Sequence, residues 1–289
     1  MNDESNHSYI VHSNTLYILE SLVNEQKTGK WLYEDLYPLT IKHEIYSIEY
    51  CSIESKSQLF SQFEKIKLEI EENLRLPTIH LEAHGNTLGF EIAHSKEFVS
   101  WSELNDKLSE INLLCRNNLI LSLGICNGHF INLDLVKRLE NNKRCPFLVN
   151  ISPQDKISPQ EIKLGYSNFY NSLFESRDFY IAMQSMKEET ILNFLLTADT
   201  VLKETVKFLN NISNDRDFTF KSSIQLQELI AKGENPFPAR NYNQSLKAFK
   251  RYKKRYYKED LEKKWNHFLM IDSFEENRDR FESFEKVWK

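Results

Sequence analysis

Apolar runs of strand length alternate along much of the chain with segments whose apolar residues recur at helical spacing. Leu59, Phe63 and Ile66, for example, recur at intervals of four and three, which is typical of an amphipathic helix. The runs predict strands at residues 14–24, 43–52, 78–84, 118–126 and 147–151. The periodic segments predict helices at residues 30–36, 55–76, 101–116, 130–141 and 161–186. Strands that alternate with helices favour an α/β fold, in which a mostly parallel sheet carries helices on both faces.

The pattern changes after Lys187, so we expect a first domain over residues 1–187 and a helical region over residues 188–289. The elements predicted for this second region are a helix at 188–209, a polar break at 210–217, a helix at 222–231 and a turn at 233–238. A tract at residues 247–264 then carries nine Lys or Arg against three acids, interleaved with aromatic residues. An acidic and aromatic segment, residues 272–285, follows it.

Two residues that can carry chemistry follow neighbouring predicted strands. His84 comes after the run Thr78–Ala83, Cys126 comes after the run Asn118–Ile125, and a Gly stands within two positions of each. Adjacent parallel strands bring such residues to one edge of a sheet. A thiolate nucleophile needs a nearby imidazole that takes its proton and later protonates the leaving amine. The pair therefore predicts a cysteine nucleophile with a histidine base, although either residue alone is more often structural.

The residues around this pair resemble the core of a caspase-like cysteine peptidase, closest to the CHAT branch and related bacterial caspase homologues. The resemblance covers Pro77 to about Lys187, extends less strongly over residues 1–76, and does not include the C-terminal region. It rests on four pieces in order, which are Leu81–Gly85, Ser100–Leu104, the strand that leads into Cys126–Gly128, and Asn150–Ser158 before a helix that contains Phe169–Leu173.

The resemblance implies a caspase-like α/β/α sandwich and a cysteine endopeptidase that needs no cofactor or metal. It implies that His84 and Cys126 are catalytic, and that the backbone N–H groups of Gly85 and Cys126 stabilise the oxyanion. Relatives of this kind often act in bacterial antiviral defence or programmed cell death, as proteases gated by a signal. One position departs from the pattern: Gly124 stands where caspases carry Gln, so a caspase-type specificity for acidic residues is not implied.

Other polar residues near the pair have two interpretations each. Asp155 follows the last predicted strand of the first domain, and it either lines a pocket for a basic substrate residue or only caps a turn. Glu82 shares a strand face with His84, and it can equally be the partner of another charge. Ser100 and Glu103 have the spacing of a capping box at the start of a helix, which is a structural motif.

The composition favours an enzyme of the cytoplasm. The four cysteines, of which we expect only Cys126 to be reactive, have neither the number nor the spacing of a disulfide framework or a zinc site. The other three are Cys51, Cys115 and Cys145. The first 13 residues lack the pattern of a secretory signal, and the apolar runs are shorter than a membrane span. The net charge of −5 over 289 residues argues against a globally basic nucleic-acid binder.

The basic tract has three interpretations. It is a solvated helix face, an interface for an activating protein partner or for an oligomer or, as the least favoured, a site for a nucleotide or nucleic acid. Its first cations are Lys247, Lys250, Arg251, Lys253, Lys254 and Arg255. The acids expected to neutralise it are Glu275, Glu276, Asp279 and Glu282. We therefore expect a protease regulated by its C-terminal region; the alternative is a catalytically silent caspase-fold adaptor whose basic tract binds a partner or an anionic ligand.

Overall fold

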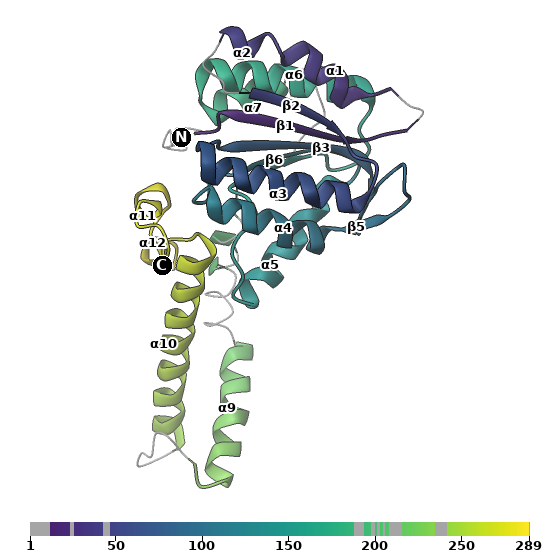
Figure 1. The fold of residues 1–289 in the computed structure, drawn as a ribbon. Helices are drawn as coiled ribbons and strands as arrows, with labels where there is room; N and C mark the ends of the chain where they lie inside the picture. Colours follow the sequence, from purple (N-terminus) through teal and green to yellow (C-terminus); the bar gives the residue numbers. More distant parts are fainter. Residues whose placement is uncertain are drawn as a thin grey trace. The chain divides into compact units, whose positions relative to one another are not determined.

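The computed structural model describes residues 12–23, 26–42, 47–187, 194–197, 200, 203–204, 206–207, 216–234 and 242–288 (Figure 1). The chain divides into two compact units. The first comprises residues 1–138 and 144–198, and the second comprises residues 139–143 and 199–289.

The first unit is built on one sheet, to which the described residues contribute eight strands. Five strands run parallel in the order β2-β1-β3-β6-β7, and β8 adds to β7 in the antiparallel direction. Their bounds are β1 Thr15–Ser21, β2 Ser47–Ser52, β3 Pro77–Asn86, β6 Ile120–Ile125, β7 Val149–Ser152 and β8 Phe194–Thr197. Every residue of β1 and of β6 is buried, as expected for apolar strands that are covered on both faces. The predicted α/β fold with a mostly parallel sheet is confirmed.

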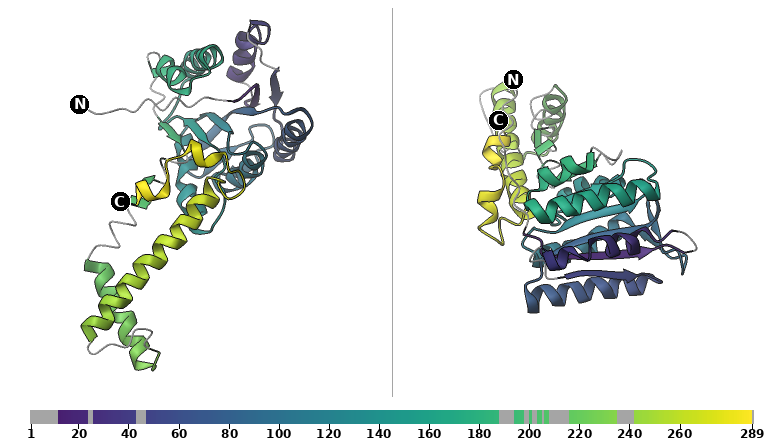
Figure 2. Two further views of the ribbon diagram at one scale, coloured as in Figure 1. Left: turned by 90° about the vertical axis from the view of Figure 1, so that its left-hand side faces the viewer. Right: turned by 90° about the horizontal axis from the view of Figure 1, so that it is seen from above.

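Helices cover both faces of this sheet, as Figure 1 shows. On one face lie α1 Thr28–Leu36, α2 Leu39–Lys42, α6 Pro159–Ser176 and α7 Phe179–Lys187. On the other face lie α3 Lys56–Asn73, α4 Trp101–Leu114 and α5 Leu133–Glu140. The apolar residues of α3 that follow the predicted helical spacing are the ones that are buried: Leu59, Phe63, Ile66 and Ile70. The view from above in Figure 2 shows the same layered arrangement.

A small antiparallel hairpin extends β3 beyond the parallel sheet. β4 Gly89–Glu91 pairs with β3, and β5 Phe98–Ser100 pairs with β4. These strands are three residues long, which is too short for an alternating pattern to be recognised in the sequence. As a consequence, β3 continues to Asn86, whereas the predicted strand ends at His84.

Three predicted helices differ from the structure. The segment 161–186 forms two helices, because Arg177 takes a left-handed conformation at φ 54° and ends α6. The segment 130–141 starts as the 3-10 helix η1, Gly128–Asn132, before α5. Within the predicted helix 188–209, residues 194–197 form the strand β8, since a short apolar run fits either structure and only its pairing with β7 decides. Residues 188–193, most of the break 210–217, residues 235–238 of the predicted turn, and residues 43–46 of the second predicted strand lie outside the described residues.

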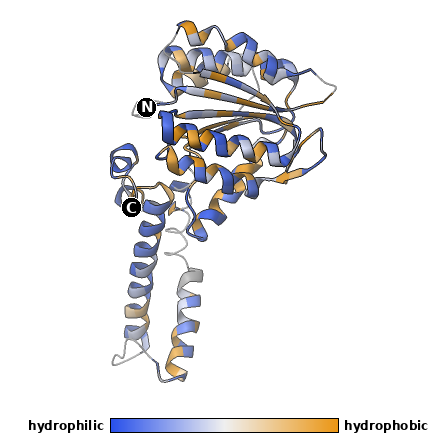
Figure 3. Cartoon of the chain, in the orientation of Figure 1, coloured by the Kyte–Doolittle hydropathy of each residue, from blue (hydrophilic) through white to orange (hydrophobic). Residues whose placement is uncertain are grey.

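The longest described elements of the second unit are helices, flanked by turns. Its helices are α9 Arg216–Ala231, α10 Tyr242–Phe268, α11 Asn277–Arg280 and α12 Phe284–Val287. The C-terminal end of α10 packs on the segments that follow it, and the rings of Trp265 and Phe284 are 5.8 Å apart in an edge-to-face arrangement. The middle of α10 is polar, as the hydropathy colours of Figure 3 show. Every described helix of the chain is too short or too polar to serve as a membrane span.

Candidate active site

The register of the sheet brings His84 and Cys126 together. β3 and β6 are adjacent parallel strands in which Ala83 pairs with Ile125. His84 is the next residue of β3, and Cys126 is the first residue after β6. His84 is exposed and Cys126 is half-buried, and both stand at the carboxyl edge of the sheet. His84 also pairs with Glu91 of β4, so the hairpin fixes the backbone that carries the imidazole. The strands that lead into His84 and Cys126 are thus adjacent and parallel, and the catalytic role of the two residues stays a prediction.

Gly85 lies against the backbone of Cys126. A Cβ atom at position 85 would stand 2.3 Å from Cγ2 of Ile125 and 3.2 Å from the carbonyl oxygen of Cys126. A side chain at this position would therefore collide with the strand that carries the cysteine. Only glycine allows β3 and β6 to approach this closely beside the thiol.

The chain turns sharply after Cys126. Asn127 takes the left-handed conformation at φ 60° and ψ 24°, and η1 begins at Gly128. A Cβ atom on Gly128 would stand 3.2 Å from the Cβ atoms of both Leu123 and Ser152, so this turn packs against the ends of β6 and β7. Asn favours the left-handed region more than most residues do, which explains Asn127 at this position.

The segment after β7 lies beside the Cys126 turn. The N–H of Asn127 donates to the carbonyl of Asp155 at 3.0 Å, and the N–H of His129 donates to the carbonyl of Pro153 at 3.3 Å. The Asp155 side chain is exposed. The main chain of Asp155 thus borders the candidate site, while a role of its carboxylate in specificity stays a prediction.

Glu82 is the partner of another residue. It is fully buried, its Oε1 lies 2.9 Å from Nε2 of His80, and its second oxygen accepts a hydrogen bond from the Thr28 hydroxyl at the start of α1. A Cβ atom at position 124 would stand 2.9 Å from Cγ of Glu82. The glycine at 124 therefore leaves the space that this buried carboxylate fills.

A second buried carboxylate, Glu20, lies in the neighbouring strand and is missed by sequence reasoning. The N–H of Gly29 donates to its Oε1 and the hydroxyl of Tyr50 donates to its Oε2, both at 2.7 Å. Burial raises the pKa of Glu20 above its ordinary value, and the charge of Glu82 acts in the same direction. The sequence signal for this residue is an acid inside the apolar run 15–21. A charged residue is seldom buried in such a strand without partners.

The other thiols differ from Cys126 in their surroundings. Cys115 and Cys145 are buried, and burial raises the pKa of the Cys115 thiol far above its ordinary value. Cys51 is half-buried in β2, and burial raises the pKa of its thiol as well. A raised pKa lowers the thiolate fraction at neutral pH, so Cys51 and Cys115 are poor nucleophiles. Burial keeps Cys145 from solvent.

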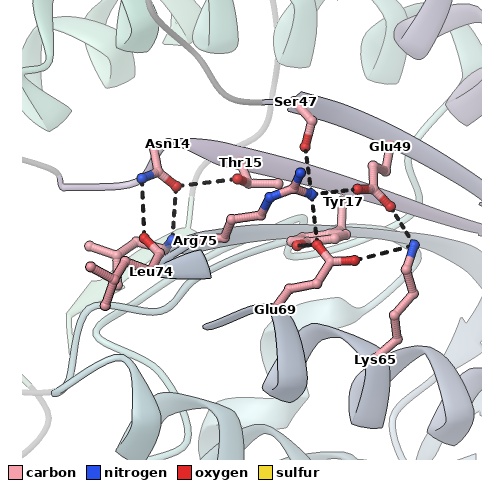
Figure 4. A network of polar contacts seen from close by, with 10 residues as sticks. Asn14, Thr15, Tyr17, Ser47, Glu49, Lys65, Glu69, Leu74 and Arg75 are labelled. Atoms are coloured by element: carbon pink, nitrogen blue, oxygen red, sulfur yellow. Dashed lines mark hydrogen bonds and ion pairs between the residues drawn. The ribbon is translucent and has the colours of Figure 1, made fainter. Parts of the chain in front are cut away.

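A polar network at the amino ends of the strands, opposite the edge that carries His84 and Cys126, is structural. Tyr17 donates to Glu69 at 2.6 Å, and Arg75 bridges Glu69 and Glu49 at 2.8 and 2.9 Å (Figure 4). Lys65 pairs with Glu49 at 2.7 Å. These contacts tie α3 and the segment after it to the first two strands, and every cation in the network faces a carboxylate.

One of the four acids expected to neutralise the basic tract has a partner elsewhere. Glu282 pairs with Lys203 at 3.2 Å, outside the tract. Within the tract, Arg255 pairs with Glu259 at 2.7 Å and Lys264 pairs with Asp260 at 3.0 Å, both one helical turn apart. Part of the neutralisation thus comes from α10 itself.

Among the described residues, no three His, Cys, Asp or Glu side chains are arranged to hold a metal ion. No known family model matches the chain, and a search of curated proteins gives no match either.

Proposed function

We propose that the chain is a cysteine endopeptidase in which Cys126 is the nucleophile and His84 is the general base. The observation that carries this proposal is the pairing of Ala83 with Ile125 on adjacent parallel strands, because His84 and Cys126 are the residues that follow this pair. The carboxyl edge of such a sheet is where open α/β folds hold their ligands. The close approach of Gly85 to the Cys126 backbone supports the same location.

The chemistry follows from the two side chains. His84 takes the thiol proton of Cys126, and the thiolate attacks the carbonyl carbon of the scissile peptide bond. Backbone N–H groups of Gly85 and Cys126 hold the oxyanion that forms, which is the role that the resemblance gives them. His84 protonates the amine as the C–N bond breaks and a thioester remains. Water then attacks the thioester, His84 takes its proton, and the carboxylic acid and the thiol are released.

The remaining parts of this proposal rest on the resemblance to caspase-like peptidases. We assign the first unit to a caspase-like sandwich and the C-terminal helices to a regulatory extension. The protease acts in the cytoplasm of a bacterium, in antiviral defence or programmed cell death, and a signal gates it.

Asp155, whose main chain contacts the Cys126 turn, selects basic residues before the scissile bond. Asp155→Asn should then reduce cleavage after Arg and Lys while other cleavage, measured on a peptide library, is unchanged.

Alkylation and cleavage mapping test the catalytic pair together. Iodoacetamide should modify Cys126 first, ahead of the half-buried Cys51, because a catalytic thiol carries more thiolate. His84→Ala should slow this alkylation, and it should lower proteolysis by about 10²- to 10⁴-fold. Cys126→Ala should remove all cleavage, mapped across a proteome, whereas the matched Cys51→Ala variant should cleave as the parent does.

The same measurements identify the alternative function. If Cys126 reacts no faster than Cys51 and the parent protein yields the same cleavage map as Cys126→Ala, the proposed chemistry is wrong. The chain would then be a catalytically silent binding or adaptor protein.

A further inference from the structure

The middle of α10 concentrates positive charge to a degree found nowhere else in the chain. Residues 247–258 contain seven cations and no acid, although the chain as a whole has a net charge of −5. The cations are Lys247, Lys250, Arg251, Lys253, Lys254, Arg255 and Lys258. This span, called the cationic span below, covers about 18 Å of helix at 1.5 Å per residue. Such a density of like charge repels itself unless anions approach it.

The cationic span also exposes aromatic rings. Tyr252, Tyr256 and Tyr257 are 51%, 58% and 46% exposed, whereas Phe249 on the same helix is buried. The rings of Tyr252 and Tyr256 lie 6.3 Å apart with 27° between their planes, so they stand side by side one turn apart. Their exposure means that the core of the second unit does not require them.

Two cations of the span are held in place by α9. Lys250 donates to the Thr219 hydroxyl, and Lys253 donates to the Gln225 side chain, both at 2.8 Å. Lys253 also lies 5.8 Å above the Phe249 ring and 6.0 Å above the Tyr257 ring. These contacts use uncharged partners, and they position the two ammonium groups on the helix. Arg255 differs, because it pairs with Glu259.

We infer that the cationic span of α10 binds single-stranded nucleic acid. Lysines and arginines along a groove or helix pair with phosphates, and exposed aromatic rings stack on unpaired bases. A single strand offers both an anionic backbone and free base faces. An acidic peptide offers the charge but no flat rings for the tyrosines, and a duplex keeps its bases stacked inside. This inference concerns the second unit alone and does not depend on the proposed protease activity.

Binding is measured with the full chain and fluorescent oligonucleotides of about 20 nucleotides, as single-stranded RNA, single-stranded DNA and duplex, because binding sites of this class span several nucleotides. The single strands should bind more tightly than the duplex, and polyglutamate of equal charge should compete poorly. The affinity should fall as salt rises from about 50 to 200 mM. No binding at the lowest salt, or equal binding of the duplex or of polyglutamate, overturns the inference.

Charge variants test the phosphate contacts. Arg251→Gln, Lys254→Gln and Lys258→Gln together should reduce the slope of log affinity against log salt by about 2, since each phosphate contact contributes about 0.7 for a single strand. The matched control changes three exposed, ion-paired lysines elsewhere, Lys30→Gln, Lys96→Gln and Lys207→Gln, and should keep the slope of the parent. An equal reduction in both triple variants would show only a general effect of net charge and would overturn the site.

Tyrosine variants test the stacking. Tyr252→Ala or Tyr256→Ala should each weaken binding about tenfold, while the corresponding Phe variants, which keep the ring, should bind as the parent does. Circular dichroism must give the same helix content for all variants. If the Ala variants fold and bind as tightly as the parent, the tyrosines do not contact bases and the inference fails.

Discussion

Two glycines shape the surroundings of Cys126, each because a neighbour occupies the place of its side chain. Gly124 leaves space for the buried Glu82, and Gly85 leaves space for Ile125. The glycine two positions before Cys126 is thus explained by a carboxylate in the next strand. Neither requirement arises from the conformation of the glycine itself, since both are contacts across the sheet.

Gly85→Ala should destabilise the protein by about 1–3 kcal/mol, because its Cβ would stand 2.3 Å from Cγ2 of Ile125 and the strands would have to shift. Chemical denaturation measures this loss, and alkylation of Cys126 should slow as the site shifts. Ile125→Ala should destabilise less in the Gly85→Ala background than alone, since it removes the colliding methyl group. If the two substitutions change the free energy of unfolding additively, the contact between residues 85 and 125 is not the cause of the loss.

Glu20 should make stability depend on pH in a defined direction. Its pKa in the folded protein lies above the ordinary value of 4.5, because of burial first. The folded state therefore holds the proton more tightly than the unfolded state, so the contribution of Glu20 is full below pH 4.5 and is lost as the pH rises through the raised pKa. The free energy of unfolding of the parent, compared with that of Glu20→Gln, should fall over this range.

Glu97 is the matched control for this measurement. Its pKa is lowered, first by the hydrogen bond from the Lys56 N–H and then by the Ser95 hydroxyl. Its contribution is present above pH 4.5 and is lost as the pH falls, so the difference between the parent and Glu97→Gln should have the opposite slope. The same slope for both variants would contradict the assignment of Glu20.

At the scale of elements, α4 is the crossover helix that links the strand of His84 to the strand of Cys126. Ser100 caps it, because its hydroxyl accepts the N–H of Glu103 at 3.2 Å. The predicted capping box is half formed, since the Glu103 carboxylate pairs with Lys56 at 2.7 Å. The complete box stands at the start of α6, between Ser158 and Glu161.

Ser100→Ala should therefore lower the free energy of unfolding by about 1 kcal/mol, as the loss of an N-cap does. Ser102→Ala is the control: this serine is exposed in the first turn of the same helix, and its replacement should change stability by less than about 0.5 kcal/mol. Thermal or chemical denaturation compares the two. Equal effects would mean that the hydroxyl of Ser100 does not act as a cap.

At the scale of the whole molecule, the chain joins a candidate catalytic unit to a helical unit that carries the cationic span. If both proposals hold, a ligand on α10 can regulate Cys126 only by binding one state of the protein more tightly than another. A single-stranded oligonucleotide should then change the alkylation rate of Cys126 in the parent. It should have no effect in the triple variant Lys253→Glu, Lys254→Glu and Arg255→Glu, whose rate without ligand should equal that of the parent. Identical responses in both proteins would leave the span without a regulatory role.

The sequence by itself determined the elements whose signals are local. Apolar runs located β1, β3 and β6, and helical spacing located α3 and α4, because burial of one face imposes its period on consecutive residues. The adjacency of the strands that lead into His84 and Cys126 also followed from the sequence, since a crossover helix between two strands implies parallel neighbours.

Only the tertiary structure decided the features that depend on partners distant in the chain. The run at 194–197 became a strand because β7 offered an edge to pair with, and His84 lies within β3 because β4 continues the pairing. Glu20 and Glu82 are buried because α1 and Tyr50 bring donors to them from other elements. A local pattern cannot encode such contacts, since each arises where segments separated in sequence meet in the fold.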